Sequence, residues 1–146
     1  MAKFSKGLWV VVMDEDKALV LENTGSAMRP DLTLKERINS ADILAVNDLS
    51  ARSQDHKHHE ETQPPDYHRM AGAVLARAVM DDLVRAHEAG QFSELALVAP
   101  PQVLGALRAL LPTALAHLVV AELHKELTGL TLEKITEHLR HDLVAE

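Results

Sequence analysis

Short apolar runs bounded by turn residues predict the strands in the first third of the chain. Residues 8–13 are continuously apolar and rich in β-branched side chains, which is typical of a central strand buried on both faces. An acidic turn at residues 14–16 ends this run, and residues 17–22 follow at hairpin distance. The two runs are therefore predicted to pair antiparallel. A third strand within residues 28–38 carries charged side chains and suits the edge of the sheet.

A change to helical spacing after residue 65 predicts the longest helix of the chain. Asp66 is suited to cap this helix, which is expected to run to about Ala89 and to stop at Gly90. Small and aliphatic side chains recur at helical spacing and predict a wide buried stripe. The stripe consists of Ala71, Leu75, Ala78, Val79, Leu83 and Ala86.

The remainder of the chain alternates strands with helices. Strands are predicted at residues 95–98 and 118–123, with a helix that starts at Pro101 between them and a last helix from about Thr131. This order predicts a single α/β domain over residues 1–146. Its mixed β-sheet combines the antiparallel N-terminal hairpin with parallel strands, and helices cover the sheet.

Composition narrows the possible partners. The chain has 146 residues, of which 47% are hydrophobic, which is enough for one sizeable core. Its net charge of −7 and its dispersed lysines and arginines show no footprint for duplex DNA. Four aromatic side chains supply no platform for stacking bases. The absence of cysteine excludes disulfides and thiolate metal sites.

The N-terminal apolar run also indicates where in the cell the protein is expected. It extends over only six residues before the acidic turn, so it is too short for a signal-peptide core or a membrane span. We therefore expect a cytoplasmic protein.

A polar loop over about residues 47–65 contains the most specific candidate for a metal site. Its imidazole groups, together with nearby glutamates, are ligand types for zinc or nickel, and the candidate ligands are His56, His58 and His59. Their spacing matches no established metal motif, and Lys57 places a cation inside the cluster. A solvated loop that binds metal only adventitiously is therefore the favoured interpretation. A small metal-dependent hydrolase with a neighbouring glutamate as base is the alternative.

Charged residues at strand ends form the second candidate site. Residues 124–126 directly follow a predicted strand, at the edge where open α/β sheets usually place ligands. Solvated strand ends are the simpler interpretation, because charged residues commonly occupy such edges. No nucleophile elbow and no glycine-rich phosphate loop is present in the sequence. The candidate partner-binding residues are Asp14, Lys17, Arg52, Arg108, His124 and Lys125.

Five sequence segments occur in the order and spacing of one bacterial family. They are residues 9–14, 18–23, 97–101, 104–108 and 125–128, the last reading Lys-Glu-Leu-Thr. On these segments the chain resembles the bacterial host-attachment protein family, described as proteins required for attachment to host cells. The middle of the chain departs from the family, because its usual Asp-Arg-Pro-Gly-Arg segment and the loop that follows are replaced.

The resemblance implies a fold and a cellular role. The family is similar in fold to the middle domain of archaeal and eukaryotic peptide-chain release factors, which implies a ribosome- or translation-linked role. The release-factor tripeptide Gly-Gly-Gln is absent from this sequence, so hydrolysis of peptidyl-tRNA by that route is not expected. We therefore favour a non-enzymatic interaction domain without a cofactor. Its partner is a ribosome, RNA or protein, and its effect on host attachment is indirect.

Overall fold

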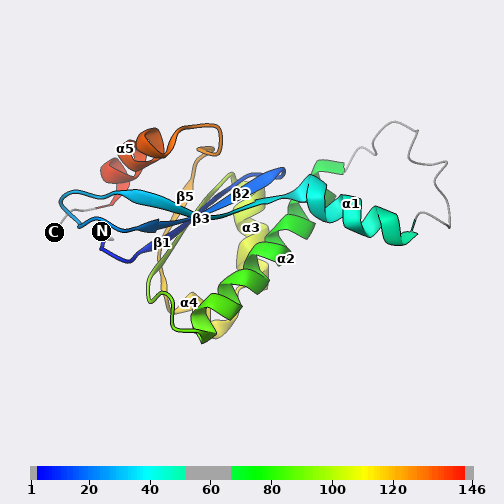
Figure 1. Cartoon of the computed structure of the whole chain (residues 1–146), viewed down its shortest axis with the longest axis horizontal. Coiled ribbons are helices and arrows are strands. Elements are labelled where there is room, and N and C mark those ends of the chain that lie inside the picture. The colour runs from blue at the N-terminus through cyan, green and yellow to red at the C-terminus, as the bar shows by residue number, and fades with distance from the viewer. Residues whose placement is uncertain (1–2, 52–66, 144–146) are drawn as a thin grey trace.

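The computed structural model describes residues 3–51 and 67–143, which build one mixed sheet with helices on both faces (Figure 1). The strands are β1 (Trp9–Met13), β2 (Lys17–Asn23), β3 (Leu32–Asn39), β4 (Leu95–Ala99) and β5 (Val119–His124). The helices are α1 (Ser40–Ala51), α2 (Tyr67–Glu88), α3 (Pro101–Leu110), α4 (Thr113–Ala116) and α5 (Leu132–Asp142).

The sheet has the order β3-β2-β1-β4-β5. β1 pairs antiparallel with β2 and parallel with β4, β2 pairs antiparallel with β3, and β4 pairs parallel with β5. The predicted α/β class, the N-terminal hairpin, the edge position of the third strand and the central position of the first are all confirmed.

Each face of the sheet has its own hydrophobic core. β1 is buried along its whole length, and alternate side chains point to opposite faces. Val11 packs in the core that includes residues of α2 and α3, whereas Val10 packs with Ile135 and Leu139 of α5. Figure 1 shows α2 and α3 on one side of the sheet and α5 on the other. A strand that is covered on both faces has no polar position, which explains its continuously apolar sequence.

Turn and cap residues set the helix ends where the sequence predicted them. Pro101 occupies the first turn of α3, and Pro100 is its N-cap. Thr131 caps α5 by accepting a hydrogen bond at 3.2 Å from the backbone N–H of Lys134. Gly90 follows α2 with a φ of 72°, a conformation that glycine adopts without strain. No helix in the described part of the chain is long and apolar enough to cross a membrane.

Two expectations about the middle of the chain need correction. The polar loop was expected to begin at about residue 47, but α1 extends to Ala51. The expected stripe on α2 included Ala78, which is only partly buried, while Ala76 and Met80 are buried. α2 packs against α3 as well as against the sheet, and this second contact widens its buried face. Residues 52–66, with the rest of the loop and the proposed cap, lie outside the described residues.

Candidate functional site

The parallel strands β1, β4 and β5 all end at one edge of the sheet, which we call the carboxyl edge. It is formed by the turn after β1 (residues 14–17), by Pro100 at the start of α3 and by the segment after β5 (residues 124–128). Open α/β sheets generally bind ligands at such an edge. Four of the six predicted partner-binding residues belong to these segments: Asp14, Lys17, His124 and Lys125.

Asp14 connects the two ends of the chain at this edge. Its Oδ1 accepts hydrogen bonds from the backbone N–H groups of Asp16 at 2.7 Å and Lys17 at 2.9 Å, which closes the hairpin turn. Its Oδ2 accepts a hydrogen bond at 2.6 Å from the hydroxyl of Thr128, which is 114 residues further along the chain. The carboxylate therefore holds the hairpin against the segment that follows β5.

These hydrogen bonds lower the pKa of Asp14. Burial by itself raises the pKa of the carboxyl group, because it disfavours the charged form. Hydrogen bonds from Thr128 and from the backbone of Lys17 and Asp16, with the charge of Lys17, outweigh burial and hold the pKa of Asp14 below its ordinary value of 3.8. A depressed pKa stabilises the fold above the pKa of the unfolded state, and this stabilisation is lost as the pH falls through the folded-state value.

Thr128→Val is expected to lower the free energy of unfolding by about 1–2 kcal/mol near neutral pH, because it removes a hydrogen bond to a charged group. The difference from wild type should shrink as the pH falls through the depressed pKa of Asp14, because the carboxylate that Thr128 stabilises is then lost. Urea unfolding at several pH values measures this. Thr113→Val, at an exposed threonine of α4, is the matched control and should change little. A difference that is independent of pH would contradict the assigned role of Asp14.

Lys125 and Arg108 are both engaged in ion pairs, on opposite faces of the sheet. Lys125 Nζ lies 2.8 Å from Asp142 Oδ2 of α5. Arg108 Nε lies 2.6 Å from Glu122 Oε1 of β5, and Glu122 stands opposite Leu97, whose side chain belongs to the α2 and α3 core. The structure therefore does not bring Arg108 and Lys125 together.

Of the remaining predicted site residues, some lie in the described part of the chain and some do not. Lys17 begins β2 beside Asp14, and His124 ends β5 with an exposed side chain. β1 and β4 lie between these two strands. Arg52 and the candidate metal ligands His56, His58 and His59 lie outside the described residues, so both assignments stay predictions. Zinc and nickel analysis of untagged protein, purified without added metal, tests the metal assignment.

The cavity that opens at the carboxyl edge is small. It has a volume of about 80 Å³ and lies between the hairpin turn and the first turns of α2 and α3. Glu15, Arg69, Gly72 and Gln102 are among its lining residues. Typical small-molecule sites are about 300–1,000 Å³. Among the described residues, this cavity is therefore smaller than a typical substrate pocket.

Sequence reasoning missed the partners that fix the carboxyl edge. Thr128 donates a hydrogen bond to Asp14. Glu122 forms an ion pair with Arg108, and Asp142 forms one with Lys125. Thr128 is the only one of the three that lies in a segment shared with the resembling family. Its side chain is buried, so the segment has a structural reason to end in a hydroxyl residue at this position.

Comparison with known proteins adds one match. The family model described as "Protein required for attachment to host cells" matches residues 9–139, which is most of the chain. The match spans β1 to α5 and includes the carboxyl edge. No curated protein matches the chain.

Proposed function

Since the chain belongs to the family of proteins required for attachment to host cells, we propose that it acts inside the cell as a non-enzymatic interaction domain. Its contact surface is the carboxyl edge of the sheet, and its partner belongs to the translation apparatus. Its effect on host attachment is then indirect, through the proteins that the cell produces.

The shape of the carboxyl edge supports this proposal. Asp14 and Thr128 tie its two segments together, so the surface is organised before a partner binds. The cavity there is about 80 Å³, too small for a typical substrate. A preorganised, shallow and charged surface fits docking of a macromolecule better than catalysis on a small molecule.

Two further points favour a protein of the translation apparatus over bare RNA. The net charge of −7 opposes contact with a phosphate backbone. The resemblance of the family to the middle domain of release factors suggests the ribosome as the setting, and this is an analogy at the level of fold.

Lys17 and His124 are the best residues with which to test the surface. The reversal Lys125→Glu is less informative, because it would place a second carboxylate beside Asp142 and loosen the end of α5. His124 has an exposed side chain, and Lys17 acts on Asp14 by its charge without a close ion pair among the residues described. The double variant Lys17→Gln, His124→Gln adds no carboxylate beside Asp14, so it is expected to keep the fold with a loss of about 1 kcal/mol or less.

We expect the wild-type protein to co-sediment saturably with ribosomes from its source organism, and the double variant to bind at least about tenfold more weakly, a loss of about 1.4 kcal/mol. Lys134→Glu, an exposed charge reversal on α5, is the control and should bind like wild type. Wild-type protein that stays in the supernatant would reject the translation link. Equal binding by the double variant would reject the carboxyl edge as the contact surface.

A further inference from the structure

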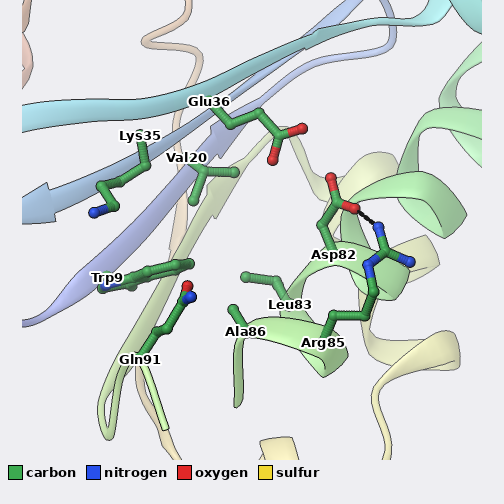
Figure 2. A pocket seen from close by; sticks show the side chains of 9 residues that line it. All are labelled: Trp9, Val20, Lys35, Glu36, Asp82, Leu83, Arg85, Ala86 and Gln91. Atoms are coloured by element: carbon green, nitrogen blue, oxygen red, sulfur yellow. Dashed lines mark hydrogen bonds and ion pairs between the residues drawn. The ribbon is translucent and has the colours of Figure 1, made fainter. Parts of the chain in front are cut away.

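The two edge strands of the sheet, β3 and β5, differ in how they are protected against pairing with another chain. β3 carries the charged residues 35–37 at exposed positions. A register shift in its pairing with β2 leaves Lys35 as the extra residue of a bulge. Figure 2 shows Lys35 and Glu36 beside Trp9, around a cavity of about 300 Å³. Charged side chains and bulges are two common devices that keep an edge strand from pairing.

β5 is much less protected. Its only strand neighbour in the described part of the chain is β4, so its outer backbone N–H and C=O groups face no strand there. Its apolar side chains belong to the two cores, yet each is only half-buried. These side chains are Val119, Val120, Ala121 and Leu123. An edge strand with partly exposed apolar side chains is a template for pairing with a further strand.

The charges at the β5 edge are balanced within the chain. Glu122 is the only acidic residue of β5, and its Oε1 lies 2.6 Å from Nε of Arg108 on α3. Just beyond β5, Lys125 Nζ lies 2.8 Å from Asp142 Oδ2. The net charge of −7 for the whole chain is therefore not concentrated at this edge, and a second copy can approach it.

We propose that β5 pairs antiparallel with β5 of a second copy of this chain, which joins the two sheets across a two-fold axis. An edge strand that pairs with its own copy forms an isologous interface, and such an interface closes as a dimer. A bulge in β5 sets the register. The pairing with β4 passes from Val119 to Ala121, so Val120 is the extra residue and the regular part of β5 begins at Ala121. A two-fold axis at Glu122 keeps this regular part within the joined sheet.

This register gives complementary contacts on both faces of the sheet. Ala121 stands opposite Leu123 of the second copy on the α5 side, where both side chains are apolar. On the α3 side, the two Glu122 carboxylates meet, and the two Arg108 side chains that already bind them complete a ring of balanced charge. Gly105, one turn before Arg108, is exposed with open space beside it, so it leaves room for α3 of the second copy.

Sedimentation equilibrium of the purified protein over a range of concentrations tests the proposal. We expect a reversible monomer–dimer equilibrium. Arg108→Glu should raise the dimer dissociation constant at least about tenfold, because four carboxylates then meet at the axis. The charge swap Arg108→Glu, Glu122→Arg should restore the dimer. Arg37→Glu, an exposed reversal on β3, is the control and should dimerise like wild type.

The chain has no cysteine, so one introduced cysteine reports the register. Glu122→Cys should form a disulfide-linked dimer in oxidised glutathione, because directly opposed residues of antiparallel strands have Cα atoms about 5.5 Å apart, within reach of a disulfide. Arg37→Cys should stay unlinked.

A wild-type protein that is monomeric at every concentration overturns the proposal. A dimer that Arg108→Glu leaves intact, or that links through Arg37→Cys and not through Glu122→Cys, overturns it as well. The proposal does not rest on the translation link, because the oligomeric state is measured without ribosomes.

Discussion

Replacing Val11 with aspartate is expected to unfold the protein. Val11 lies in the middle of β1, has no exposed surface, and packs in the core between the sheet and α2 and α3. A carboxylate there would have no cation or hydrogen-bond donor from a side chain, and burying such a group costs several kcal/mol. The total stability of a domain of this size is about 5–15 kcal/mol, so most of it would be lost.

Circular dichroism and thermal unfolding measure this directly. Leu34→Asp is the matched control, because it makes the same kind of change in another strand of the sheet where the side chain is 40% exposed. The introduced carboxylate stays hydrated at this position, so only a small loss is expected. A Val11→Asp variant that melts at the wild-type temperature would reject the placement of β1 at the centre of the sheet.

The strands and helix ends could be predicted because each depends on a local pattern. The run at residues 8–13 is apolar at every position since β1 is covered on both faces. Pro101 and Thr131 mark helix starts by their own backbone and side-chain chemistry. α1 lacks such a signal, because its apolar residues are not gathered on one face, and the sequence predicts a polar loop where its last turn lies.

The candidate sites depend on contacts between distant residues, which no local pattern reveals. Asp14 was selected from the sequence as a charge at a strand end, but its bond to Thr128 gives it a structural role. The bulge at Lys35 was also missed, because the sequence shows only three consecutive charges on an edge strand. Without the bulge, the sequence gives no reason to place Lys35 and Glu36 around the same cavity as Trp9.

The segment at residues 125–128, which carries part of the family resemblance, has a structural explanation. Lys125 pairs with Asp142, Leu127 is buried in the core beneath α5, and Thr128 bonds Asp14. All three contacts hold α5 and the hairpin to the end of β5. The resemblance at this segment therefore has a structural reason, independent of the proposed partner.

Asn23, at the end of β2, organises the other edge of the sheet. Its side chain has no exposed surface and is fully occupied. Nδ2 donates hydrogen bonds to the carbonyl oxygens of Phe4, Ser5 and Ser26 at 3.1, 3.0 and 3.3 Å. Oδ1 accepts hydrogen bonds from the backbone N–H groups of Gly25 and Asp31 at 3.0 and 2.9 Å. One amide thus joins the N-terminal segment to the loop between β2 and β3.

Asn23→Asp is expected to destabilise the protein by several kcal/mol near neutral pH, a large part of its total stability. The substitution keeps the shape of the side chain but replaces a donor that faces three carbonyl oxygens with a charged acceptor, in a fully buried site. Burial and these carbonyl groups should raise the pKa of the new carboxyl group. The loss should therefore diminish as the pH falls through that raised pKa, where the protonated group again donates one hydrogen bond.

Urea unfolding of wild type and Asn23→Asp between about pH 7 and pH 4 tests both parts of this expectation. Gln102→Glu is the control, since it makes the same amide-to-carboxylate change at an exposed position in the first turn of α3. Its effect should stay below about 1 kcal/mol, as for other exposed charges. A wild-type midpoint for Asn23→Asp at neutral pH, or a loss that acid does not relieve, would mean that this amide does not hold the two segments together.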